Sequence, residues 1–249
     1  MMNRIMRYLL PLFIIPFFCL DVLAQQQAAL VSNREIVKKE DSTTEILDFR
    51  VLPLFGEIKK NQEQQKKDDV FLKNCDENFK DRTEASKFFA ERGWEYIGEG
   101  QLDTAVYRFN LSYLLNPQNM EAYWGLGVVS FQKGKFEESA KLLSHGLKLD
   151  PNNAMLMVDI ATVQMNCFVE KRNCEEIDDA VRLLEKSVKL DSTNANAWLK
   201  FAVAEYHQEH FDKSWEYIHK CRMLDLSFVD LNFVQQLIAK KEDPMGIFK

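Results

Sequence analysis

Histidines near the C-terminal end of the sequence come closest to the spacing of a chemical site. His207 and His210 stand three positions apart, so on a helix their imidazoles would share one face and could ligate a metal. His219 lies in the same region, but no further ligand follows at a suitable spacing. We therefore interpret these histidines as neutral surface residues and keep a metal or small ligand at His207 and His210 as the alternative.

The motifs of nucleophilic and phosphate chemistry are missing from the sequence. It contains no Gly-rich phosphate loop, no G-x-S-x-G elbow and no H-E-x-x-H pair. The 38 Asp and Glu residues could supply acids and bases, but in a solvated helical protein they are normally surface charges. We expect no catalytic residue, no cofactor and no metal, so the chain is not predicted to be an enzyme.

Two closely spaced cysteines suggest a structural role. Cys167 and Cys174 flank the residues by which one repeat, described below, exceeds the others, and a disulfide between them is expected in an oxidising compartment. The alternatives are two free thiols or, less simply, a redox pair, although no C-x-x-C spacing occurs. Cys221 falls at a small core position, and the pairing of Cys75 and Cys221 stays open.

Composition favours helices and argues against nucleic acid as a partner. The 249 residues include only nine Gly and six Pro, too few for a sandwich or barrel of many short strands. Hydrophobic residues make up 46%, enough to bury a core, and the formal net charge is −6. Phosphate binding needs a concentrated basic surface, which an acidic chain does not suggest.

The N-terminal segment 1–24 has the order of a secretory signal peptide. Arg4 and Arg7 precede an apolar run, and Ala24 offers a small residue at the cut. A membrane-spanning helix would need about 20 apolar residues, whereas Asp21 closes this run and Pro16 interrupts it. We expect cleavage after Ala24 and a periplasmic mature protein with no stable membrane insertion.

The sequence repeats itself at a fixed interval. Five residues, Gly93, Gly100, Leu102, Pro117 and Asn119, find their counterparts 34 positions later in Gly127, Gly134, Phe136, Pro151 and Asn153. In such a period, glycines at 93 and 127 permit helices to cross closely, glycines at 100 and 134 end helices, and prolines mark repeat boundaries.

This pattern resembles the tetratricopeptide repeat (TPR), a pair of antiparallel helices that together span about 34 residues. The segment 120–153 matches the family at nearly every signature position, and 86–119 matches well. The third repeat is longer than the others and has Ser192 where proline is usual. The resemblance implies an all-α, right-handed α-α solenoid of about four helix pairs, with repeats at 86–119, 120–153, 154–194 and 195–226 and a capping helix at 228–241.

The expected boundaries follow from these repeats. Helices are expected at 84–98, 101–115, 120–133, 136–149, 154–167, 175–190, 195–209 and 211–224, with Asp81 and Glu84 capping the first. The chain divides into a signal peptide at 1–24, a polar tether and lead-in at 25–82 and the repeat domain at 83–243. Within the lead-in, 59–73 is expected to be a solvated helix, and 46–55 either lies on the solenoid or binds another protein.

In the TPR family, the first helix of each repeat lines a concave groove. Carried over position by position, the candidate partner-binding residues are Trp94, Ile97, Trp124, Val128, Phe131, Met165, Leu199 and Tyr206. Members that clamp a peptide's C-terminal carboxylate use Lys, Asn and Arg at such positions, but here they hold apolar and aromatic residues. An apolar segment or helix of another protein is the expected ligand, unless the N-terminal segment or the capping helix already fills the groove.

The segment from Arg92 to Pro117, followed by 121–127, is also similar to exported TPR proteins of Gram-negative bacteria such as the Bacteroidota. That similarity implies no activity. We therefore expect a non-enzymatic protein–protein adaptor in the cell envelope, with another protein or peptide as its partner. Self-association through the groove or the capping helix is a further possibility.

Overall fold

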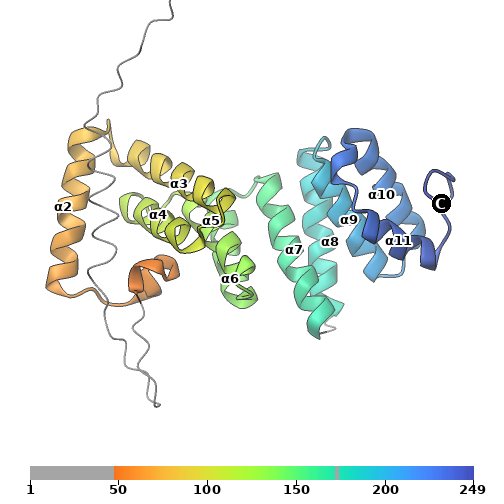
Figure 1. Cartoon of the computed structure of the whole chain (residues 1–249), viewed down its shortest axis with the longest axis horizontal. Helices are drawn as coiled ribbons and strands as arrows, with labels where there is room; N and C mark the ends of the chain where they lie inside the picture. The colour runs from red at the N-terminus through yellow and green to blue at the C-terminus, as the bar shows by residue number, and fades with distance from the viewer. Residues whose placement is uncertain (1–47, 172–173) are drawn as a thin grey trace, which may run out of the picture. The chain divides into compact units, whose positions relative to one another are not determined.

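The structure is a computed structural model that describes residues 48–171 and 174–249 (Figure 1). The expected signal peptide and the tether up to residue 47 lie outside the described residues. The chain divides into two units, Met1–Phe49 and Arg50–Lys249, and every helix discussed below lies in the second. Among the described residues, no helix combines the length and the apolarity needed to cross a membrane.

The described chain is all helical, and its central helices pack in sequential pairs. After α2 (Gln62–Asn78), the pairs are α3 (Arg82–Gly98) with α4 (Leu102–Leu115), α5 (Met120–Gln132) with α6 (Phe136–Leu149), α7 (Ala154–Lys171) with α8 (Cys174–Leu190), and α9 (Ala195–His207) with α10 (Phe211–Leu224). Each first helix also contacts the first helix of the next pair. The predicted all-helical repeat architecture is confirmed.

Asparagines begin three of the first helices. Asn119 Oδ1 accepts a hydrogen bond from the amide of Glu121, Asn153 Oδ1 from Leu156, and Asn194 Oδ1 from Ala197. Each bond satisfies an amide that the helix itself leaves without a partner. The recurrence of Asn119 and Asn153 is thus explained by helix capping.

Glycines permit the closest helix contacts. A Cβ built on Gly93 would lie 2.7 Å from the Phe109 ring, and one on Gly127 would lie 2.5 Å from Leu143. Gly125 is tighter still, because its Cβ would come within 2.0 Å of the same Phe109 ring. The Phe109 ring therefore packs against two glycine-bearing helices, α3 and α5, and occupies the space that side chains would fill.

The turns inside the first, second and fourth helix pairs each use a left-handed residue. Gly100 and Gly134 supply it with φ of 73°, and Glu209 stands at the same place in the fourth repeat with φ of 62°. For a residue with a Cβ, this conformation costs roughly 1–2 kcal/mol. The fourth repeat therefore carries strain that the first two avoid.

We expect Glu209→Gly to stabilise the protein by about 1 kcal/mol, because glycine removes the strain at φ of 62°. The midpoint of urea unfolding should rise accordingly. Glu209→Ala is the matched control and should give no such gain, since alanine keeps the Cβ. An equal rise for both variants would show that the glutamate charge, and not the backbone, is responsible.

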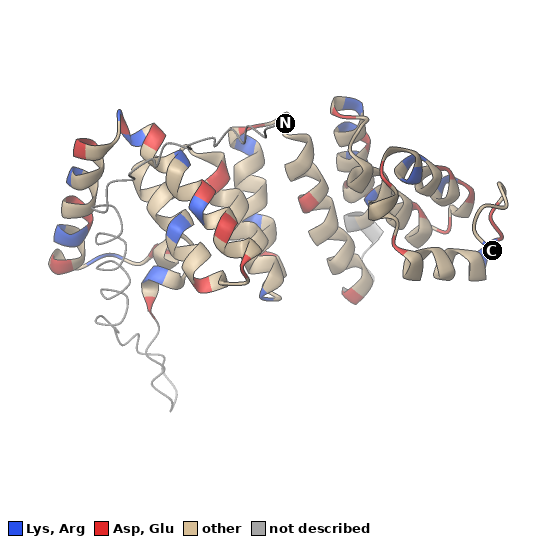
Figure 2. Cartoon of the chain, turned by 45° about the horizontal axis from the view of Figure 1, so that its top comes forward, with Lys and Arg blue, Asp and Glu red and all other residues tan. Residues whose placement is uncertain are grey.

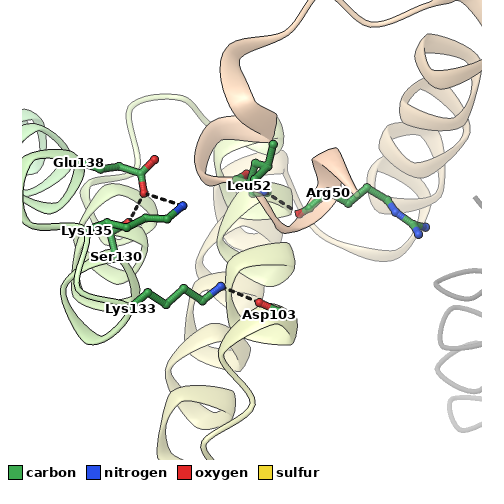
Figure 3. Close-up of polar contacts among 8 residues, drawn as sticks. Arg50, Leu52, Asp103, Ser130, Lys133, Lys135 and Glu138 are labelled. Atoms are coloured by element: carbon green, nitrogen blue, oxygen red, sulfur yellow. Dashed lines mark hydrogen bonds and ion pairs between the residues drawn. The ribbon is translucent and has the colours of Figure 1, made fainter. Parts of the chain in front are cut away.

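The lead-in packs on the second-helix side of the first repeat. Asn110 Nδ2, on α4, donates to the carbonyls of Arg50 and Leu52 at 2.8 Å (Figure 3). The short 3-10 helix η2 (Pro53–Glu57) contacts α4, and Phe55 within it is 5% exposed. The lead-in therefore lies against the repeats, as one interpretation of the sequence predicted, although in 3-10 turns.

Helix α2 differs from the solvated helix expected at 59–73. It runs to Asn78, and its second half packs Phe71, Leu72 and Cys75 against a cluster that includes Phe89. Cys75, which the sequence could not place, is 5% exposed there, and burial raises the pKa of its thiol to about 11. Figure 2 shows red and blue residues along α2, and most of these charged residues are exposed.

The C-terminal helix α11 (Leu231–Lys240) is shorter than the predicted 228–241, because the 3-10 helix η3 (Leu226–Phe228) precedes it and Asp230 caps its first turn. Phe233 and Leu237 pack on α10 beside Trp215, so α11 covers the last repeat. The expectation of a terminal capping helix is therefore correct in kind, with its start placed too early in the sequence.

A buried carboxylate ties down the residues after α11. Asp243 accepts hydrogen bonds from the amides of Met245, Ile247 and Phe248 and lies 2.8 Å from Nε2 of His219. Burial raises its pKa, but the backbone donors and His219 outweigh that effect and lower the pKa to about 2.

Acid should release this tail. A carboxyl whose pKa falls from its ordinary 3.8 to about 2 on folding contributes stability above pH 3.8 and loses that contribution as the pH falls towards 2. We expect Asp243→Asn to cost about 2 kcal/mol at pH 7, the loss of bonds to a charged acceptor. The difference in melting temperature between wild type and variant should vanish near pH 2; a difference independent of pH would contradict this account.

Candidate functional site

The first helices present a face that carries most of the predicted groove residues. Trp94 and Ile97 on α3 and Trp124, Val128 and Phe131 on α5 are all half-buried, with part of each side chain open to solvent. Their inner parts pack on the cores of the first two repeats. We call this surface, formed by α3, α5, α7 and α9, the first-helix face.

The two tryptophans of this face are held by carboxylates on the first helix of the next repeat. Trp94 Nε1 donates to Glu121 Oε2 at 2.7 Å, and Trp124 Nε1 donates to Asp159 Oδ2 at 2.6 Å. The indole rings also meet edge to face, with centroids 5.2 Å apart. Hydrogen bonds and ring contacts therefore fix both rings before any ligand arrives.

A hollow of about 630 Å³ opens beside these rings. The residues lining it come from α3, α5, the start of α7 and one helix cap: Lys87, Ala90, Glu91, Trp94, Asn119, Glu121, Trp124 and Met155. Met155 is 58% exposed, although the methionine side chain is apolar. The small side chain of Ala90 leaves the room that this hollow occupies. We call it the Trp94–Trp124 hollow; it could hold one large apolar side chain.

Asp159 is a residue of this site that the groove positions did not include. Burial raises the pKa of its carboxyl, and the Trp124 hydrogen bond and the charge of Lys200 partly offset the rise. It is the one charged residue between positions 154 and 168, and Figure 2 shows α7 uncoloured along most of its length. A lone carboxylate in a long apolar run was the signal that could have identified it.

The groove residues of the fourth repeat are occupied by the chain itself. The Tyr206 ring meets the Phe233 ring of α11 edge to face at 5.5 Å, and Leu199 packs in the same cluster. Val203 joins that cluster as well. The capping helix α11 therefore covers part of Tyr206 at the C-terminal end of this face, whereas no described residue of α11 or the lead-in lines the Trp94–Trp124 hollow.

Met165 is not an exposed groove residue. It is 4% exposed and belongs to a core cluster with Leu184 and Phe201. The extra residues of this repeat lengthen α7 to Lys171, and in the added turn Phe168 reaches the His207 ring. A position-by-position transfer from the family could not include this extra turn.

The histidines do not come together as a ligand set. His207 contacts the rings of Phe168 and Tyr206, and burial lowers its pKa. His210 Nδ1 lies 2.8 Å from Oε2 of the buried Glu205. In residues 48–171 and 174–249, no three His, Cys, Asp or Glu side chains form a group that could hold a metal.

The contact between His210 and Glu205 has a counterpart in the second repeat. Lys213 Nζ also lies 3.5 Å from Glu205. The Glu205 carboxylate on the first helix therefore contacts His210 from the turn and Lys213 from the second helix. At the equivalent positions of the second repeat, Ser130 and Lys135 meet Glu138 (Figure 3). We interpret both contacts as bridges within a helix pair, which leaves the metal alternative without a geometric basis.

Of the two cysteines in the predicted disulfide, the structure describes only the Cys167 side chain. Cys167 is buried inside α7 and not at a helix end, and the connection at 172–173 and the Cys174 side chain lie outside the described residues. The disulfide between Cys167 and Cys174 therefore stays a prediction. Cys221 is fully buried, as expected, and burial raises its thiol pKa to about 11.

Comparison with known proteins agrees with the geometry. The family model described as "Tetratricopeptide repeat" matches residues 120–153. Among curated proteins, the chain is 23% identical over 114 residues to the "Protein CTR9 homolog" of Arabidopsis thaliana; that stretch is 46% of this chain but only 10% of the relative, so the chain spans about a tenth of its length.

Solved structures of other repeat proteins share the fold. The chain superimposes on a TPR protein of Thermus thermophilus, TTC0263, with a TM-score of 0.55 at 13% identity, covering 62% of this chain and 85% of that one. It also matches MamA of Desulfovibrio magneticus RS-1 (TM-score 0.52, 18% identity, 65% and 88% covered) and PilF of Pseudomonas aeruginosa (0.52, 16%, 64% and 72%). The helix pair at 120–153 thus matches the tetratricopeptide-repeat family, and the four successive helix pairs of this chain share the fold of solved tetratricopeptide-repeat proteins.

Proposed function

We propose that this protein is a non-enzymatic adaptor of the bacterial cell envelope, which binds a segment of another protein on the N-terminal half of its first-helix face. The Trp94–Trp124 hollow carries this proposal, because it combines two fixed aromatic rings with an exposed methionine, Met155. Tetratricopeptide repeats typically mediate protein–protein interactions. Aromatic anchors in a preformed hollow are the usual energetic centres of such interfaces.

The envelope location rests on the order of residues at the N-terminus. Arg4 and Arg7, the apolar run and Ala24 follow the pattern of an exported protein. Mass measurement of the mature N-terminus tests this separately from binding. A chain that begins at Gln25 would support export, and one that retains Met1 would contradict it.

Photo-crosslinking in the native host tests the binding site. A benzophenone amino acid replaces Met155 in the hollow or, as a matched control, Met223, which is 70% exposed near the end of α10. We expect discrete crosslinked proteins from position 155 that disappear when Trp124→Ala is added. The same products from both positions would contradict binding at the hollow.

A further inference from the structure

We propose that the Trp94–Trp124 hollow selects a partner segment that carries a large apolar side chain next to a lysine or arginine. This inference rests on the proposed function and adds the chemistry of the partner. It follows from three features of the hollow: its apolar floor, its engaged indole donors and the charges on its rim.

The floor of the hollow is apolar and can therefore accept an apolar side chain of the partner. Ala90, which is 1% exposed, lines the hollow together with the two indole rings and the exposed Met155. Methionine side chains adapt their shape to different ligands. Burial of a Leu, Phe or Trp side chain here would supply most of the binding free energy.

The indole N–H groups are not free to bind the partner. Both already donate to carboxylates, Trp94 to Glu121 and Trp124 to Asp159. The exposed part of each ring's π surface therefore remains for the partner, and each ring has a carboxylate at its edge. An aromatic face is already attractive to cations, and a carboxylate held beside it adds to that attraction.

The rim of the hollow favours a cation as well. Glu91 and Glu121 place two carboxylates there against one ammonium, Lys87. Within the described part of the chain, no ion pair engages Glu91 or Lys87, so Glu91 can accept a basic group of the partner. The net charge of −6 also attracts a basic segment at long range. The chemistry is therefore opposite to that of a clamp for a terminal carboxylate.

Selection of peptides from a library displayed on phage tests this inference. Random twelve-residue peptides are selected on the full chain, on Glu91→Lys and on the double variant Trp94→Ala, Trp124→Ala. For the wild type we expect enriched peptides with a large apolar residue and a Lys or Arg within three positions. Glu91→Lys should shift the charge preference away from basic residues.

The outcomes separate the inference from the proposed function. Enrichment that depends on the tryptophans but shows neutral or acidic flanks would overturn the inference and leave the proposed function standing. Enrichment that is the same on the double tryptophan variant, or absent from the wild type, would overturn both. Circular dichroism confirms that each variant is folded.

Milder variants keep the test independent of folding. Titration of one enriched basic peptide should show about two- to fivefold weaker binding to Glu91→Gln, the effect of one exposed ion pair. Lys87→Gln, the matched control from the same rim, should bind equally well or more tightly. Weaker binding to Lys87→Gln than to Glu91→Gln would overturn the inference.

Discussion

Replacing both Trp94 and Trp124 by alanine is expected to weaken binding of the crosslinked partner about 1,000-fold. Each ring is half-buried and held by a hydrogen bond and an aromatic contact, so its ordering costs little on binding. Anchors of this kind commonly contribute about 2 kcal/mol or more each. Isothermal titration calorimetry with the purified full chain measures the loss.

Trp198 provides the matched control for this prediction. It is also half-buried on a first helix, but its ring packs on Tyr217 of α10 and beneath Lys220, and its Nε1 donates to the carbonyl of Ser192. Trp198→Ala should leave the affinity within about twofold of wild type. A comparable loss for both sets of variants would mean that the tryptophans act through stability and not through contact.

Gly125→Ala is expected to destabilise the protein by about 3 kcal/mol or more, a fall in melting temperature of roughly 10 °C. The added Cβ would lie 2.0 Å from the Phe109 ring, which is fully buried and cannot move away without disturbing α3 at Gly93. Thermal unfolding followed by circular dichroism measures this effect.

Gly98 supplies the control for the same substitution. It is the last residue of α3, and a Cβ there would meet no atom within 4 Å. Gly98→Ala should leave stability unchanged or raise it by up to about 1 kcal/mol, since alanine is the better helix former. If Gly125→Ala were equally harmless, the close packing of Phe109 between the first two repeats would be wrong.

The sequence predicted the repeats because their constraints recur. Gly93 and Gly127 each face a large side chain of the second helix, so the same residue type returns at the same place in the next repeat. Gly125 was not predicted, because it does not recur: its counterpart in the preceding repeat is Glu91. A contact made only once leaves no periodic signal.

The candidate site was predicted less completely than the fold. Transfer of family positions identified Trp94 and Trp124 but treated all four repeats as equally open. The contact of Tyr206 with Phe233 and the burial of Met165 both depend on elements specific to this chain, the capping helix and the lengthened α7. Hydrogen bonds between helices, such as that from Trp124 to Asp159, are set by packing across repeats and not by local sequence.

Methionine methyl resonances offer the most direct test of where the partner binds. Met155 at the hollow, Met223 on α10 and Met245 in the tail are 58%, 70% and 61% exposed, so each reports on its own surface. The full chain, labelled with 13C at its methionine methyl groups, is titrated with the crosslinked partner. The account predicts that the Met155 resonance shifts while those of Met223 and Met245 stay in place. A shift at Met223 or Met245 without one at Met155 would contradict it.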